Sequence, residues 1–325
     1  MNLAPRFARG VQDLLGRAAK STLVRLAITA AILAYLATRI DMAEAARAMA
    51  AISRPHLAAV LVLVAIDRAV MILRWILLLR ASGIGISVAD ATRLFLISSF
   101  VGSFLPAGLG ADAARAYGLA RESTTGSEAL ASVAVDRVLG VLSLVSMGVI
   151  GVIAWAPDNR NDWRLAGAVV VIGGACVAAF WADRWLRWLV PTHRHERAIT
   201  RRVLRLSDAV SRYRDRRGVL LHVLGWSFVV QLLRVTQAYL LGLGLGMTVP
   251  FTYFLVFMPV GLLILLLPVS ISGFGLPQGV IIWLLRPVGV EDSTAFALST
   301  LIVLTGLAGN LPGLWLWLRR RKSDG

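Results

Sequence analysis

The sequence predicts an all-α integral membrane protein, with six full spans and two broken or re-entrant helical hairpins arranged as an inverted repeat. Three observations predict this class. Of the 325 residues, 58% are hydrophobic and only 16% are charged, whereas soluble domains carry about 25% charged residues. Apolar runs of about 20 residues, the length at which a helix crosses a bilayer, recur along the chain. Two further apolar stretches, residues 94–121 and 253–286, are broken by proline and glycine clusters.

The composition also excludes several classes of protein. The chain is too apolar for a disordered segment, a fibre or an ordinary soluble enzyme, and its single cysteine, Cys176, excludes an internal disulfide. A net charge of +16 would suggest nucleic-acid binding in a soluble protein, but membrane proteins collect Lys and Arg in cytoplasmic loops. We therefore expect no nucleic-acid partner. Walker, Gly-x-Ser-x-Gly and His-Glu-x-x-His motifs are missing, so we predict a protein that is not an enzyme and uses neither a metal nor a cofactor.

The predicted elements begin with a basic, amphipathic segment at residues 1–21, in which apolar residues recur at the spacing of a helix on the membrane surface. A transmembrane domain, residues 22–318, contains all the spans, and a basic tail, residues 319–325, follows it. The polar lead before the first span is too long for a cleavable signal peptide, so we expect that span to be retained. The six full spans are residues 22–38, 57–79, 129–155, 164–182, 219–241 and 295–318.

Basic loops predict how these spans are oriented, because Lys and Arg collect on the cytoplasmic side. The basic regions are the two ends of the chain and the loop 183–218, which holds eleven arginines. Within this loop, residues 199–213 keep a helical apolar stripe that is typical of a segment lying on lipid. We therefore expect both termini and this loop to be cytoplasmic.

The two broken stretches resemble each other. One contains Phe104-Leu-Pro-Ala-Gly-Leu-Gly-Ala-Asp112 and the other Leu266-Leu-Pro-Val-Ser-Ile-Ser-Gly-Phe-Gly275. The predicted orientation is consistent only if each crosses an even number of times, so the two enter from opposite sides, as inverted repeats of transporters do. Broken helices are tolerated in a membrane only where protein or a water-filled cavity surrounds them. Two alternatives stay open: tight kinks between packed helices, or a substrate cavity near the middle of the membrane.

Ionisable residues inside the spans are the first candidates for a site. Such groups are costly in a membrane, and they face either a functional interior or a partner charge. Substrate binding and structural pairing, for example of Asp136 with an arginine of another span, both remain open. The residues are Asp67, Arg74, Asp136, Arg137 and Arg234.

Asp112 and Arg115 follow the first glycine cluster. If a helix begins near Asp112, these two residues share a face of it. Free amides at a helix start, together with a guanidinium group, can bind phosphate. The alternative is an ordinary arginine at the membrane edge beside a helix-capping aspartate.

Five segments match the pattern of one known family, in order, over most of residues 57–322. They are Arg68 to Arg80, Phe104-Leu-Pro through Asp112-x-x-Arg115-Ala-Tyr, Ala129 to Gly140 with Asp136-Arg137, Pro268-x-Ser270-x-x-Gly273-Phe-Gly275, and the final Leu-Pro-Gly before the basic end. With these segments the chain resembles the lysylphosphatidylglycerol synthase transmembrane-region family.

The resemblance implies the flippase-like domain that stands at the front of the bacterial multiple peptide resistance factor, where it moves an aminoacylated phospholipid between leaflets. Stand-alone members are associated with translocating or delivering lipids, including glycolipid and polyprenyl carriers. The chain lacks the soluble aminoacyl-transferase domain, so lipid aminoacylation is not implied. It also has Ala111 where the family has glycine, and Pro277-Gln278 where the family has Arg-Glu. The loss of that charged pair predicts a different headgroup.

We therefore predict a multi-pass protein of the bacterial cytoplasmic (inner) membrane that translocates a phospholipid, glycolipid or polyprenyl-linked lipid. Arginines would neutralise the headgroup phosphate, and glycines would let backbone amides approach it. Asp67, Asp112 and Asp136 would hold the arginines, with Asp136 as the counter-charge of Arg137. The predicted substrate-binding residues are Arg74, Asp112, Arg115, Asp136, Arg137, Arg234, Gly108, Gly110, Gly273, Gly275 and Gln278.

Two other functions remain open at this stage. The protein would be a non-transporting membrane partner if the loop 183–218 recruits a glycosyltransferase or another lipid-synthesis enzyme. It would be a transporter of small polar solutes if the cavity does not take lipid. The expected partners under the main prediction are membrane lipids with an anionic or phosphate-bearing headgroup.

Overall fold

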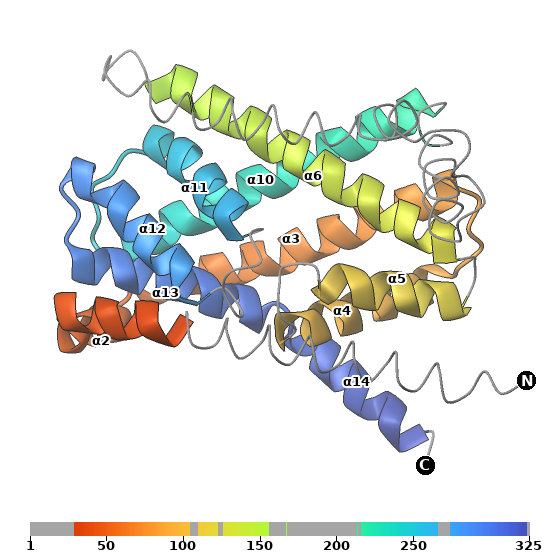
Figure 1. Ribbon diagram of the computed structural model, residues 1–325, viewed down its shortest axis with the longest axis horizontal. Helices are drawn as coiled ribbons and strands as arrows, with labels where there is room; N and C mark the ends of the chain where they lie inside the picture. The colour runs from red at the N-terminus through yellow and green to blue at the C-terminus, as the bar shows by residue number, and fades with distance from the viewer. Residues whose placement is uncertain are drawn as a thin grey trace, which may run out of the picture.

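Three long helices run side by side along the longest dimension of the molecule (Figure 1). The computed structural model describes residues 29–104, 110–122, 126–155, 167, 213, 216–265 and 274–323. Each long helix has 28 to 30 residues, which is about 42–45 Å at 1.5 Å per residue and exceeds the roughly 30 Å hydrocarbon core of a bilayer. The three helices are α3 (Arg54–Ala81), α6 (Gly126–Trp155) and α10 (Arg217–Gly244).

Local sequence signals explain where α3 begins and where α3 and α10 end. Helix α3 has Pro55 in its first turn, where the missing N–H and the fixed φ of proline suit a helix start. It ends in a turn in which Gly83 has φ +76°, a left-handed conformation that favours glycine. Helix α10 ends in the same way at Gly246, with φ +80°, and the amide of Met247 donates back to the carbonyl of Gly242 at 2.9 Å.

The first broken stretch forms two helices that pack against each other, α4 (Val88–Phe104) and α5 (Gly110–Glu122). Their approach depends on small residues, because a Cβ added at Gly102 would collide with Ala111. A helix thus starts close to Asp112, which is the condition under which Asp112 and Arg115 share a helix face. The break itself, residues 105–109, lies outside the described residues.

The second broken stretch forms α11 (Phe251–Leu265) and α12 (Leu276–Leu285), which also contact each other. A 3₁₀ turn, η2 (Arg286–Val288), follows. Helix α11 lies directly on α6, where a Cβ at Gly151 would meet the backbone carbonyl group of Leu255 at 2.5 Å. The break between α11 and α12, residues 266–273, lies outside the described residues.

The last predicted span, residues 295–318, is not one continuous helix. It is divided into α13 (Asp292–Ala308) and α14 (Leu311–Ser323), with turn residues Gly309 and Asn310 between them. Pro312 explains the interruption, because proline cannot donate to the carbonyl of Ala308 and its ring crowds that turn. The side chain of Asn310 donates instead to Ser103 Oγ on α4, at 2.8 Å.

A short helix, α2 (Met42–Ala50), packs against α13 and was not predicted. The carboxylate of Asp41 accepts from the amide of Glu44 at 2.9 Å and caps its start. The spacing of aspartate and glutamate here is a helix-start signal that sequence reading can recognise. Before α2, residues 29–39 are helical, which agrees with the end of the predicted first span.

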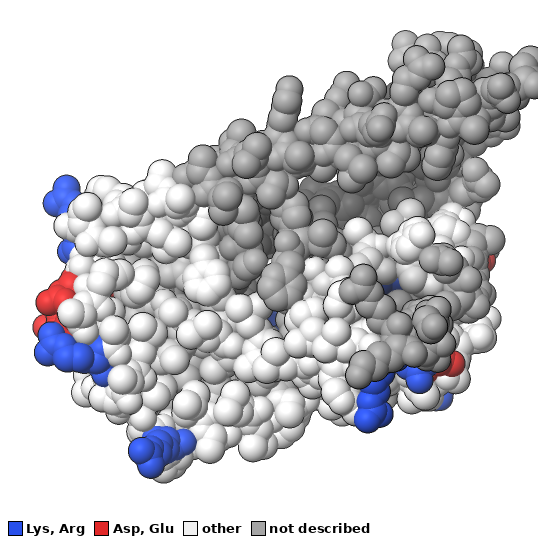
Figure 2. All heavy atoms as spheres, turned by 90° about the horizontal axis from the view of Figure 1, so that it is seen from below, with Lys and Arg blue, Asp and Glu red and all other residues white. Residues whose placement is uncertain are grey.

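Within the described residues, four helical stretches are long and apolar enough to cross a membrane: α3, α6, α10 and Asp292–Arg319. Charged side chains of the described part gather toward the two ends of the face drawn in Figure 2, and the belt between them is almost free of charge. This pattern is typical of a surface in contact with lipid. The predicted segment 1–21, span 164–182 and stripe 199–213 fall outside the described residues, apart from Gly167 and Tyr213. The span count of six and the orientation therefore stay predictions.

Candidate functional site

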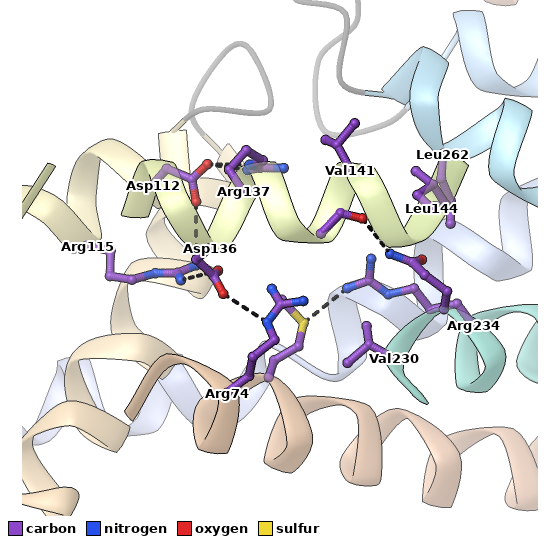
Figure 3. Close-up of a pocket in the computed structure, with 13 residues that line it drawn as sticks. Arg74, Asp112, Arg115, Asp136, Arg137, Val141, Leu144, Val230, Arg234 and Leu262 are labelled. Carbon is purple, nitrogen blue, oxygen red and sulfur yellow. Dashed lines mark hydrogen bonds and ion pairs between the residues drawn. The ribbon is translucent and has the colours of Figure 1, made fainter. Parts of the chain in front are cut away.

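A cavity of about 260 Å³ lies between α3, α5, α6, α10 and α11 (Figure 3). Six ionisable residues that are distant in the sequence converge on it from four of these helices, all six of them in the predicted site. The remaining lining is mainly apolar. The ionisable residues are Arg74, Asp112, Arg115, Asp136, Arg137 and Arg234, and the others are Met71, Gly140, Val141, Leu144, Val230, Gln231 and Leu262.

Asp136 on α6 joins two arginines from different helices. Arg74 Nε on α3 lies 2.8 Å from Asp136 Oδ1, although its N–H is not aligned for a hydrogen bond, so the contact is an ion pair. Arg115 Nη1 on α5 donates to Asp136 Oδ2 at 3.3 Å. All three side chains are at least nine-tenths buried. The pairing of Asp136 with an arginine of another span, one of the two alternatives left open by the sequence, is therefore present.

Asp112 on α5, and not Asp136, is the counter-charge of Arg137. Arg137 Nε donates to Asp112 Oδ2 at 2.8 Å, and a second nitrogen of the same guanidinium group contacts this oxygen. The expectation that Asp136 balances Arg137 is wrong, because adjacent residues of a helix point in directions about 100° apart. Asp112 also lies 3.5 Å from Arg115 Nη2, so it links the two ion pairs.

Two aromatic rings and two carboxylates contact Arg115. Its guanidinium carbon lies 4.4 Å from the centre of the Phe95 ring and 5.3 Å from the centre of the Trp75 ring. Aromatic faces stabilise a cation at these distances. Together with Asp112 and Asp136, the two rings hold this arginine in one position at the wall of the cavity.

Arg234 on α10 pairs with a third carboxylate, Asp67 on α3. Its Nε donates to Asp67 Oδ1 at 3.2 Å. Asp67 also lies 3.6 Å from Arg68, whose Nη2 donates to the carbonyl of Gly306 on α13 at 3.3 Å. The network thus continues from the cavity to the last predicted span, and Arg234 keeps 28% of its side chain exposed.

The predicted site did not include two polar residues of α10. Ser227 Oγ accepts from Arg74 Nη1 at 3.0 Å, and Gln231 Nε2 donates to the carbonyl of Gly140 at 3.2 Å. The signal was present, because Ser227, Gln231 and Arg234 follow one another at positions i, i+4 and i+7, the spacing of one helix face.

Only some of the predicted glycines lie among the described residues, together with Gln278. Gly110 is the first residue of α5, whereas Gly108 and Gly273 lie outside the described residues. Gly275, with φ +96°, precedes α12, and its amide donates to Gln278 Oε1 at 2.6 Å. Neither Gly275 nor Gln278 lines the cavity. Their geometry is that of a helix cap, and their role in substrate binding stays a prediction.

The described lining carries four guanidinium and two carboxylate groups, so its formal net charge is +2. Within the described ranges, no three His, Cys, Asp or Glu side chains gather in a way that could hold a metal ion. An anion is therefore the ligand that this charge distribution favours.

A comparison with protein families decides the family. The model of the lysylphosphatidylglycerol synthase TM region matches residues 22–313. The chain belongs to this family. The matched range includes all the described helices from residue 29 to the start of α14, and with them every charged residue of the cavity. Family membership and the apolar spans make the chain a multi-pass membrane protein of a lipid-related family. No curated protein matches the chain.

Proposed function

We propose that the protein translocates a lipid with a phosphate-bearing headgroup between the two leaflets of the bacterial inner membrane, as a transporter and not as an enzyme. The observation that carries this proposal is the cavity of net positive charge inside a bundle of apolar helices. Its family, named for a lipid-related membrane region, supports the same class of substrate. The lipid itself would be a phospholipid, a glycolipid or a polyprenyl-linked lipid.

The electrostatics of the cavity support an anionic headgroup. Uncompensated charge is costly inside a membrane, and an incoming phosphate would balance the excess of guanidinium groups. Arg137 and Arg234 keep 35% and 28% of their side chains exposed, so they remain accessible to a ligand. A guanidinium group can grip phosphate through two parallel hydrogen bonds, which lysine cannot do.

The size of the cavity supports binding of a headgroup alone. Its volume of about 260 Å³ is slightly below the roughly 300–1,000 Å³ of sites that enclose a whole small molecule. The acyl chains would therefore stay outside, along the apolar surface of the bundle. Such binding would let the polar headgroup cross while the chains remain in lipid.

The test is lipid movement in proteoliposomes. Fluorescent lipids in the inner leaflet become accessible to an added quencher only if they are translocated, and rates are scaled to correctly inserted protein. Arg137→Gln and Arg234→Gln should each slow the movement, by about ten- to a hundredfold if one charge-assisted hydrogen bond worth about 1.5–3 kcal/mol is lost. Arg93→Gln is the matched control, because Arg93 pairs with Asp90 at 3.5 Å on an exposed part of α4, away from the cavity.

The outcomes separate the alternatives. Unchanged rates in both cavity variants would remove the proposed phosphate site. Uptake of polar solutes without lipid movement would favour a solute transporter. Absence of both activities would favour a non-transporting partner of a lipid-synthesis enzyme, and reporter fusions in the 183–218 loop would test the cytoplasmic placement that such a partner needs.

A further inference from the structure

The four arginines of the cavity are not equivalent. Arg115 uses both of its terminal nitrogens on carboxylates, Nη1 on Asp136 and Nη2 on Asp112. Arg137 turns one edge of its guanidinium group, Nε and Nη2, toward Asp112. Arg115 is therefore committed to holding the two carboxylates, whereas Arg137 holds Asp112 through one edge while 35% of its side chain stays exposed.

Arg74 and Arg234 each keep one terminal nitrogen available. Arg74 contacts Asp136 through Nε and Ser227 through Nη1, which leaves Nη2. Arg234 contacts Asp67 through Nε and the sulfur of Met71 through Nη2, which leaves Nη1. No described residue accepts a hydrogen bond from either remaining nitrogen. The two guanidinium groups, one from α3 and one from α10, point toward each other across the cavity (Figure 3).

The charge of the cavity sets the charge of the ligand. Asp67, which pairs with Arg234, also pairs with Arg68, and the charges of Asp67 and Arg68 cancel, so the net charge of the described cluster stays at +2. A phosphodiester carries one negative charge and would leave an uncompensated positive charge in a setting of low dielectric, where such a charge is costly.

We infer that the cavity takes a phosphate with two negative charges, a terminal phosphomonoester or a diphosphate, and that Arg74 and Arg234 clamp it between α3 and α10. Arg115 is then a positioning residue that fixes Asp136, and through it Arg74. The inference rests on the proposed function for its source of phosphate, a lipid headgroup. A free phosphate ion has the same chemistry, so the experiment includes both.

The test compares two lipids that differ in one charge. The purified full chain in detergent is titrated at pH 8 with dioleoyl phosphatidic acid or with dioleoyl phosphatidylmethanol, and native mass spectrometry counts the bound lipid. At this pH a phosphomonoester, whose second pKa is about 6, is a dianion, whereas the methyl ester stays a monoanion. We expect phosphatidic acid to bind at least about tenfold more tightly, the effect of one added charge-assisted contact.

Variants assign this preference to the clamp. Arg234→Gln should abolish the preference. Arg74→Lys should weaken it while keeping a positive charge beside Asp136, because lysine offers a single point of charge. Arg93→Gln should keep the full preference, and thermal unfolding of each variant verifies that the fold is retained. A preference that survives both clamp variants in folded protein would overturn the assignment to Arg74 and Arg234.

Two outcomes separate this inference from the proposed function. Equal affinity for the two lipids would overturn the inference that the cavity takes a dianion, even if lipid movement were observed. A preference for phosphatidic acid without any lipid movement would keep the dianion site and remove the translocation proposal. Inorganic phosphate is the third probe. If this ion binds and neither lipid does, the site still takes a dianion, and the ligand is a free phosphate ion instead of a lipid headgroup.

Discussion

The two broken stretches look alike in sequence but contribute different chemistry to the cavity. The first, α4 and α5, supplies a carboxylate and a guanidinium group, Asp112 and Arg115, whereas the described part of the second, α11 and α12, supplies only Leu262. In the second stretch the buried amide of Gln278 is used within the stretch, where it caps α12. Similar proline and glycine patterns therefore specify similar backbone breaks, while the ionisable residues beside them decide which one contacts an anion.

The largest loss of stability is expected where the first stretch is attached to the long helices. Asp136→Asn removes the carboxylate that pairs with both Arg74 and Arg115. Breaking a buried ion pair by removing one partner typically costs about 3–5 kcal/mol, so this variant should unfold at clearly lower temperature or denaturant concentration. Asp90→Asn, which affects an exposed pair with Arg93 and an exposed hydrogen bond from Ser87, is the control. Equal stability of Asp136→Asn and wild type would contradict the role of this carboxylate as a shared counter-charge.

The second stretch should respond to changes in packing and not in charge. Gly151→Val puts a side chain against the backbone of Leu255 and forces α6 and α11 apart. Overpacking of this kind costs about 1–3 kcal/mol, and chemical unfolding in detergent measures it. Loss of phosphate binding by Gly151→Val without any loss of stability would contradict this contrast between the two broken stretches.

Gln278→Leu tests whether Gln278 contributes to ligand binding. The variant removes the acceptor of the Gly275 amide, and loss of a helix-capping hydrogen bond costs about 1 kcal/mol. Lipid affinity should stay unchanged, because Gln278 does not line the cavity. A drop in affinity with normal stability would instead support the binding role that the sequence predicts for it.

The smallest change in stability is expected at Gly140, which lies on α6 beside the cavity. A Cβ there would be 3.7 Å from Arg74 Nη1, an ordinary contact. Gly140→Ala should leave the fold intact or stabilise it by up to about 0.5–1 kcal/mol, since alanine is the better helix former. The added methyl group narrows the space beside Arg74, so affinity for phosphatidic acid should fall. An unchanged affinity would place the ligand away from this arginine.

The helices and the charged residues of the site were accessible from the sequence, because apolar length and the high cost of charge in a membrane are local properties. Asp136 and Arg234 were recognised in this way, and Asp112 and Arg115 were recognised by their place after the first glycine cluster. Their pairing was not accessible. Which carboxylate meets Arg137 depends on how α5 and α6 are rotated against each other, and this rotation is set by packing.

Two other differences have local causes that sequence reading passed over. The capping pattern from Asp41 to Glu44 marks the start of α2, and Pro312 explains why the last predicted span is interrupted at Gly309 and Asn310. The rings of Trp75 and Phe95 around Arg115 are a different case. Apolar residues at helical spacing carry no sign that one of them faces a cation, so only the folded arrangement identifies them.

The shared carboxylate of Asp136 also constrains how the chain can evolve. One side chain on α6 balances arginines on two other helices, so replacing it leaves two buried cations, and replacing either arginine relieves only one of them. Single-step drift at these three positions is therefore disfavoured, since the effects of neighbouring substitutions do not add independently. Among relatives we expect the aspartate and both arginines to be inherited or lost together, as a unit that a comparison of many sequences would reveal as three covarying columns.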